Sequence, residues 1–193
     1  MKRRHALAAA CAAVLLAACG KEAGSSKPAA APSTPVSIER IAAEAKGFNV
    51  GSTMSARVVY VFFDAQCPHC AALWEAAKPL KAQARFVWIP VGLLGDKSVA
   101  QGAAILAAAD PVASMEQNEA SVQQRQGGIA AMGVSDAQRE DVRRNTQLLT
   151  AFGFGGVPTI IGKNAQSGEL VTIDGAVPAV TLAQKLGLSL PGG

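Results

Sequence analysis

Short apolar runs along the chain predict four strands. Residues 58–63 read Val-Val-Tyr-Val-Phe-Phe, and residues 85–91 contain a similar run. Continuous β-branched and aromatic segments of this length are typical of strands buried on both faces of a sheet. Residues 157–161 and 169–173 predict two further strands, and the turn-forming residues at 163–168 predict a hairpin between them.

Apolar residues at helical spacing precede and follow the first of these strands. Residues 38–45 predict a short amphipathic helix that stops at Gly47. A second helix is expected to begin at Pro68, because proline suits the first turn of a helix, and to run on through Leu80. The order here is therefore strand, short turn, helix.

A long helical block separates the second predicted strand from the third. Residues 97–151 are rich in alanine and dotted with charges, with expected breaks at Asp110-Pro111 and Gly127-Gly128. A last helix is expected at about 178–186. Strands alternating with helices predict an α/β protein, although periodicity alone does not determine how the strands are ordered.

The first residues resemble the leader of an exported lipoprotein. Basic residues at positions 2–4 precede the apolar run 6–18, and Leu16-Ala17-Ala18-Cys19 resembles a bacterial lipobox. We expect a signal peptide at 1–18, lipidation at Cys19, a flexible Ala/Ser/Pro-rich tether at 19–35 and a folded domain at 36–193. The alternative is an ordinary cleaved signal peptide with a chance cysteine. A membrane-spanning anchor is disfavoured because the apolar run is shorter than the roughly 18 to 20 residues needed to cross a bilayer.

Composition and charge set limits on size and partners. Half of the 193 residues are hydrophobic, which suffices for one sizeable core. The formal charge of +4 comes mostly from the leader, since loss of its three basic residues leaves 15 basic against 14 acidic side chains. A nearly neutral domain gives no electrostatic reason to expect nucleic acid as a partner.

The cysteines point to redox chemistry rather than to a structural bridge. Cys11 lies within the leader and Cys19 is assigned to lipid, which leaves Cys67 and Cys70 for the folded domain. This pair closes too short a loop to restrict the unfolded chain much. Half of a zinc site is the alternative, but zinc needs two further ligands. The folded domain has one histidine, His69, which lies between the two cysteines, so we expect no metal.

Two cysteines in the pattern Cys-x-x-Cys at the start of a helix provide both thiols that disulfide exchange requires. One thiolate attacks a disulfide sulfur, and a second thiol resolves the mixed disulfide. Cys67 is placed at the helix N-terminus, where backbone N–H groups and the helix dipole favour an anion. Cys70 lies one turn further and is expected to be shielded. We therefore assign Cys67 as the nucleophile and Cys70 as the resolving thiol.

Two segments resemble the DsbC/DsbG family of disulfide isomerases and reductases. They are Val-Phe-Phe-Asp-Ala-Gln-Cys-Pro-His-Cys at 61–70, followed by Leu73-Trp74, and the insert at 103–111 continuing to 119–121, which resembles DsbG in particular. The resemblance implies a thioredoxin-like fold, with a mixed sheet flanked by helices and a helical insertion between the second and third core strands. It also implies a cis bond at Val157-Pro158, in a loop that faces the redox pair and binds substrate. A plain proline at the start of a strand is the alternative.

Several positions depart from the DsbG pattern. Pro68-His69 matches the oxidase DsbA, where DsbG-like proteins have Pro-Tyr, so these two residues are expected to tune the site toward oxidation. Val157 is likewise the DsbA choice. Thioredoxin and DsbA carry a buried acid six residues before the first cysteine, and this chain has Val61 there. Asp64 matches the DsbC/DsbG pattern and is either a proton relay to Cys70 or a local turn residue.

These observations predict a lipid-anchored periplasmic thiol-disulfide oxidoreductase, on the inner face of the outer membrane. We expect it to act on cysteines of exported proteins, with no cofactor beyond the Cys67–Cys70 disulfide, and the resemblance to DsbG implies that sulfenylated cysteines are among its substrates. By the resemblance a DsbD-like membrane reductant would recycle it. A monomer is expected, because residues 36–56 are too few for the dimerisation domain of the family. The alternatives are a DsbA-like disulfide donor and, from another class, a metallochaperone or a non-catalytic binding module.

Overall fold

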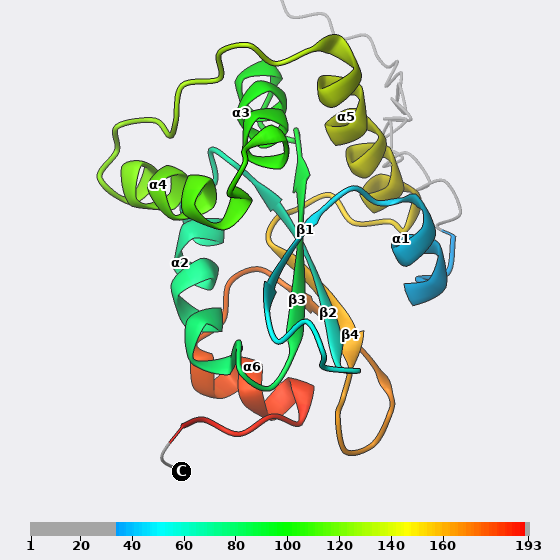
Figure 1. Ribbon diagram of the computed structural model, residues 1–193. Coiled ribbons are helices and arrows are strands. Elements are labelled where there is room, and N and C mark those ends of the chain that lie inside the picture. Colours follow the sequence, from blue (N-terminus) through cyan, green and yellow to red (C-terminus); the bar gives the residue numbers. More distant parts are fainter. Residues whose placement is uncertain (1–33, 192–193) are drawn as a thin grey trace, which may run out of the picture. The chain divides into compact units, whose positions relative to one another are not determined.

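A five-stranded mixed sheet lies at the centre of residues 34–191, the part of the chain that the computed structural model describes (Figure 1). Along the sheet the strands follow the order β1-β3-β2-β4-β5. β2 and β3 are parallel, and the other three pairs are antiparallel. The strand bounds are Phe48–Gly51 for β1, Val58–Asp64 for β2, Arg85–Val91 for β3, Thr159–Lys163 for β4 and Leu170–Asp174 for β5.

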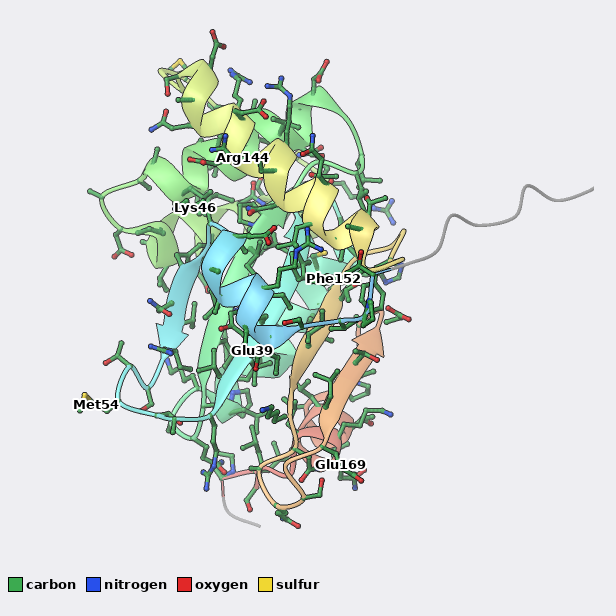
Figure 2. All side chains as sticks on the ribbon, turned by 90° about the vertical axis from the view of Figure 1, so that its right-hand side faces the viewer. Glu39, Lys46, Met54, Arg144, Phe152 and Glu169 are labelled. Atoms are coloured by element: carbon green, nitrogen blue, oxygen red, sulfur yellow. The ribbon has the colours of Figure 1, made fainter. Side chains whose placement is uncertain are left out.

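β2 is the central strand, and its apolar sequence suits burial on both faces. Val61 and Phe63 belong to a core shared with helices α2 (Pro68–Ala77) and α6 (Ala179–Leu186). Tyr60 and Phe62 point the other way, into a core shared with α1 (Ile38–Glu44) and α5 (Asp136–Ala151). Side chains alternate between the faces of a strand, so a continuous apolar run feeds both cores. Figure 2 shows α1 and α5 in front of the sheet, with Phe152 just beyond the end of α5.

Three helices between β3 and β4 form the insertion that the sequence predicts. α3 (Asp96–Ala107) packs against α5 and β3, and α4 (Pro111–Gln123) packs against α2. α2 ends in a short 3-10 turn, η1 (Lys78–Leu80). The predicted α/β class, the four predicted strands and the helical insertion are confirmed. No helix within residues 34–191 has the length and apolar character needed to cross a membrane.

The structure differs from the sequence prediction in three places. The edge strand β1 was not predicted, so the insertion lies between the third and fourth strands of the sheet rather than the second and third. α1 ends at Glu44, before Gly47, and the glycine serves a close approach instead, since a Cβ there would lie 2.6 Å from the Trp88 carbonyl oxygen. Val157 and Pro158 precede β4 rather than starting it.

The predicted leader and Cys19 lie outside the described residues, as does most of the tether. The signal peptide, the lipid and the domain bounds at 18 and 35 therefore stay predictions.

Candidate active site

The turn between β2 and α2 presents Cys67 at the end of the sheet. The Cys67 N–H donates to the Asp64 carbonyl oxygen at 3.0 Å. Asp64 is fully buried, and its carboxylate accepts two backbone hydrogen bonds of 2.9 Å, from the N–H groups of Gln66 and Leu94. Both oxygens are thus engaged in holding the turn and the loop after β3. Of the two roles considered for Asp64, a proton relay and a local turn residue, this arrangement favours the turn residue.

Cys67 is the N-cap residue of α2, and Pro68 occupies the first turn, as predicted. The Cys70 thiol donates a hydrogen bond to the Cys67 sulfur and is the main cause that lowers the pKa of Cys67, to about 6. The N–H groups of Cys70 and His69 lower it further, while burial of the sulfur opposes them. Unpaired N–H groups at a helix N-terminus favour an anion. Cys67 is therefore mostly a thiolate at neutral pH.

Cys70 has the opposite character, although it lies only three residues further on. Its side chain is fully buried, and burial raises its pKa well above the usual range. The hydrogen bond to Cys67 and the negative charge there raise this pKa further. At neutral pH the pair thus consists of one thiolate near the surface and one protonated thiol beneath it.

The loop before β4 faces the redox pair. The Val157-Pro158 bond is cis, as the family resemblance implied. The Val157 carbonyl oxygen lies 3.7 Å from the Cys67 Sγ. β4 pairs with β2, and Thr159 lies opposite Phe62, so the start of β4 and the end of β2 meet at one end of the sheet. A groove runs from this loop to the end of β5, lined by Gly153, Phe154, Gly155, Gly156, Val157, Asp174 and Gly175.

His69 and Pro68 are exposed on the rim of the site. Attraction between the His69 ring and the Cys67 thiolate lowers the pKa of Cys67, as predicted, but it is the smallest of the contributions. The backbone N–H of His69 contributes more. The imidazole therefore contributes less to the acidity of Cys67 than the backbone N–H groups of the helix do.

The helical insert supplies polar side chains that the sequence analysis did not single out. The Asn118 amide donates to the Ala65 carbonyl at 2.9 Å and accepts from the Ile129 N–H at 3.1 Å. Gln66 and Gln101 both donate to the Gly127 carbonyl, at 2.8 and 2.9 Å. Together they join the turn before Cys67 to the loop between α4 and α5.

One signal for these residues is present in the sequence. Asn118 lies three residues after Met115 and four before Val122, so helical spacing places it on the buried side of α4. A second signal is the presence of glycine at position 128, which the structure explains. Its φ is +81°, and a Cβ there would lie 2.6 Å from the Asn118 Oδ1.

Residues 34–191 contain no group of three or more His, Cys, Asp or Glu side chains placed to hold a metal ion.

Comparisons with known proteins agree with this geometry. Residues 50–188 match the family model of the thioredoxin-like domain. The chain is 33% identical over 146 residues to the thiol:disulfide interchange protein DsbG of Pseudomonas aeruginosa, covering 71% of this chain and 54% of that protein. It is 36% identical over 107 residues to DsbG of Escherichia coli, covering 53% of this chain and 42% of that protein. The chain thus spans about half the length of these relatives. The resemblance to DsbG stated from the sequence is confirmed.

Solved structures share the fold at lower identity. The catalytic domain of ScsC from Proteus mirabilis superposes with a TM-score of 0.61 at 17% identity, covering 77% of this chain and 96% of that one. A periplasmic thioredoxin-like protein from Salmonella enterica serovar Typhimurium gives a TM-score of 0.62 at 22% identity, covering 80% of this chain and 97% of that one. The implied thioredoxin-like fold is confirmed.

Proposed function

The chain belongs to the thioredoxin-like domain family, and from that membership we propose that it is a thiol-disulfide oxidoreductase of the bacterial envelope. One observation carries the proposal: Cys67 has a pKa of about 6 at a helix N-terminus, while the buried Cys70 beside it has a raised pKa. Disulfide exchange needs this division of roles, because the thiolate is the attacking species and the second thiol must wait for the mixed disulfide.

The reducing direction proceeds in two steps. The Cys67 thiolate attacks a sulfur of a substrate disulfide, forms a mixed disulfide and expels the other substrate sulfur as a thiolate. With a sulfenylated cysteine it attacks the sulfenic sulfur instead, and the hydroxyl group takes up a proton and leaves as water. Cys70 then loses its proton and attacks the Cys67 sulfur. The substrate leaves as a thiolate, and the Cys67–Cys70 pair is oxidised by two electrons.

Substrates are proposed to be cysteines of exported proteins, bound along the Val157-Pro158 loop. The Val157 carbonyl at 3.7 Å from Cys67 Sγ is positioned to pair with an extended peptide that crosses the sulfur. The groove that continues toward Gly175 is lined mostly by glycine, which leaves room for a substrate backbone to approach closely.

A specific observation favours the disulfide donor as the second candidate. A lowered pKa of Cys67 stabilises the reduced form, and a couple with a stable reduced form is a stronger oxidant. Pro68-His69 is also the DsbA dipeptide. Redox titration against glutathione decides between the two: a potential near that of the reducing thioredoxin couple supports a reductase, and a much higher potential supports a donor.

Location and partners rest on the leader and on the family resemblance. A lipidated Cys19 followed by Gly20 would hold the domain at the periplasmic face of the outer membrane. A DsbD-like membrane reductant would then keep the cysteines reduced. We expect a monomer, and light scattering of the soluble domain at micromolar concentration measures this directly.

Insulin reduction and substrate trapping test the proposal. The wild-type domain should accelerate reduction of insulin by dithiothreitol, and Cys67→Ala should not. Cys70→Ala should retain substrates on Cys67 as mixed disulfides that can be identified by mass spectrometry, with the double variant Cys67→Ala/Cys70→Ala as the background control. Equal insulin reduction by wild type and Cys67→Ala would contradict the proposal. Stoichiometric metal in the purified protein, together with no insulin reduction, would favour the metallochaperone. A protein with neither metal nor insulin reduction would favour the binding module.

A further inference from the structure

Glu119 is a buried acid beside the redox pair for which the fold has no evident use. Its side chain is 1% exposed. One carboxyl oxygen, Oε1, accepts a hydrogen bond from the Asn118 amide at 3.2 Å. The other, Oε2, is buried without a hydrogen-bond partner among residues 34–191. A buried carboxyl oxygen without a partner is costly and rare in native proteins, and such a group often has a functional role.

The contacts of α4 show where Glu119 points. One turn before it, Glu116 accepts a hydrogen bond of 2.6 Å from the Trp74 indole N–H. One turn after it, Gln123 donates to the Ala71 carbonyl at 3.4 Å. Residues three and four apart share a helix face, so Glu119 faces α2 between Ala71 and Trp74, next to the first turn that carries Cys70. Figure 1 shows α4 lying against this part of α2.

A purely structural role does not account for the carboxyl group. The neighbouring Asn118 already links α4 to the turn before Cys67 and to the loop after α4. Glu119 makes no such link, and its single bond is to Asn118 itself. The other buried acid of the site, Asp64, has both oxygens engaged by backbone N–H groups. Of the two acids, only Glu119 keeps an oxygen available.

We propose that Glu119 takes up the proton that Cys70 releases when it resolves the mixed disulfide, and returns it in the reverse reaction. The inference rests on the proposed function, because it concerns the second step of that exchange. It assigns to a residue of the helical insert the role of proton-transfer group for Cys70.

In the mixed disulfide, the Cys70 S–H proton moves to the Glu119 carboxylate, and the Cys70 sulfur forms a bond to the Cys67 sulfur. The bond between Cys67 and the substrate sulfur breaks, and the substrate leaves as a thiolate that takes a proton from water. In the reverse direction a substrate thiolate attacks Cys67, and Cys70 leaves with the proton held by Glu119.

The charges around Glu119 couple its proton to the state of Cys67. The ionisable groups whose charges act on Glu119 are Cys67 at the N-cap of α2, Asp64 at the end of β2 and Glu116 on α4, and the charge of Glu119 acts in turn on Cys70. Burial is the main cause that raises the pKa of Glu119 to about 8, and the charges of Cys67, Asp64 and Glu116 add to it, while the Asn118 amide lowers it. Formation of the mixed disulfide removes the charge of Cys67. One of the causes that raise the pKa of Glu119 is then absent, which favours the carboxylate at the step in which Cys70 must lose its proton.

The aromatic disulfide DTNB separates the two steps in one experiment. Reduced protein should release one thionitrobenzoate when Cys67 attacks the reagent, and a second when Cys70 displaces it from Cys67. In Glu119→Gln, which keeps the shape and the Oε1 acceptor but cannot exchange the proton, the first phase should stay within twofold of wild type. General acid–base groups contribute roughly 10²–10⁴-fold to a rate, so we expect the second phase to slow at least tenfold.

Two further variants complete the test. Glu75→Gln removes a half-exposed acid of α2 that is bonded to Lys78, and both phases should keep their wild-type rates. Glu119→Asp retains a carboxyl group and should recover part of the second-phase rate. Should Glu119→Gln fail to fold, Glu119→Asp becomes the test, with a slower second phase and an unchanged first phase expected.

Several outcomes would overturn the inference. A second phase in Glu119→Gln with the wild-type rate and pH profile would mean that Glu119 carries no proton for Cys70. Equal slowing of both phases would mean that Glu119 acts only on the structure of the site. Release of a single thionitrobenzoate by the wild-type protein would remove the proposed function itself, and with it the inference.

Discussion

At the residue scale, the acidity of Cys67 arises from groups within three positions of it in the chain. The Cys70 thiol and the N–H groups of His69 and Cys70 all belong to the first turn of α2. A Cys-x-x-Cys pattern followed by helical spacing therefore suffices to predict which cysteine is the nucleophile. Local chemistry of this kind is the part of a site that a sequence reveals best.

The lowered pKa of Cys67 makes the stability of the reduced protein depend on pH. Folding lowers this pKa from about 9 to about 6. Between these values the unfolded chain binds more protons than the folded one, so the contribution grows as pH rises and vanishes below pH 6. We expect the unfolding free energy of reduced wild type, relative to reduced Cys67→Ser, to rise by about 1 kcal/mol from pH 5 to pH 7. Urea unfolding at the two values measures it, and an unchanged difference would contradict the lowered pKa.

Replacement of His69 by tyrosine tests how much the side chain tunes the site. His69→Tyr removes the smallest of the contributions that lower the pKa of Cys67 and keeps the backbone N–H. We expect the pKa of Cys67 to rise by less than about one unit, which would make the couple more reducing by up to roughly 30 mV. Redox titration of both proteins against glutathione measures the change. An equal potential, or a more oxidising variant, would show that the imidazole does not tune Cys67.

Residues whose role depends on distant contacts could not be assigned from the sequence. Asn118 and Glu119 lie in a polar stretch of α4 that resembles a solvated helix, and their burial results from packing on α2 and on the turn at Ala65. Helical spacing from Met115 indicates which side of α4 they occupy. It does not indicate that this side covers the redox pair.

At the scale of elements, four of the five strands were predicted and the four-residue edge strand β1 was not. β2 and β3 are seven residues each, with apolar side chains directed to both faces. β1 has four residues, Phe48–Gly51, only one of them fully buried, and ends in glycine. Its strand conformation depends on pairing with β3, which a local pattern does not contain. The break expected at Gly127-Gly128 is longer than a turn and spans residues 124–135. Hydrogen bonds from α3 and α4 to Ile129 hold this loop, and such distant contacts are not visible in a local pattern.

The attachment of this loop to the active-site turn gives a test at the element scale. Asn118→Ala would leave the Ala65 carbonyl and the Ile129 N–H without these partners in a buried setting. Each unsatisfied group costs about 1–3 kcal/mol, so with two such groups we expect the unfolding free energy to fall by about 2–6 kcal/mol. Urea unfolding measures the loss. Asn49→Ala, at an exposed position on β1, is the matched control and should change stability by less than about 0.5 kcal/mol. Equal losses in both variants would contradict the role assigned to Asn118.

At the scale of the whole molecule, the leader predicts that the domain is tied to a membrane by lipid. Cell fractionation should recover the wild-type protein with membranes, whereas Cys19→Ala should be released into the soluble fraction. Two acyl signals suffice for stable anchoring, and Cys19→Ala removes the residue that would carry them. Fractionation of the wild type as a soluble protein, unchanged by Cys19→Ala, would refute lipidation.

The mixed sheet and its helical insertion matter for function because they gather the site from distant segments. β2 and α2 supply the two cysteines, the loop before β4 supplies the Val157 carbonyl, and α4 covers the redox pair from the side. The family resemblance was needed to predict the approach of the Val157-Pro158 loop, since the two segments are separated by 90 positions. Sequence periodicity alone predicts the elements without their order in the sheet.

Alkylation of the reduced protein as a function of pH tests the division of labour between the two cysteines most directly. Brief exposure to iodoacetamide from pH 4 to pH 9, followed by digestion and mass spectrometry, reports the rate at each cysteine. Only the thiolate reacts, so Cys67 should be modified with a half-maximal rate near pH 6, and Cys70 should remain unmodified across the range. Modification of Cys70 before Cys67, or a Cys67 rate that rises only above pH 8 as for an ordinary thiol, would contradict the account.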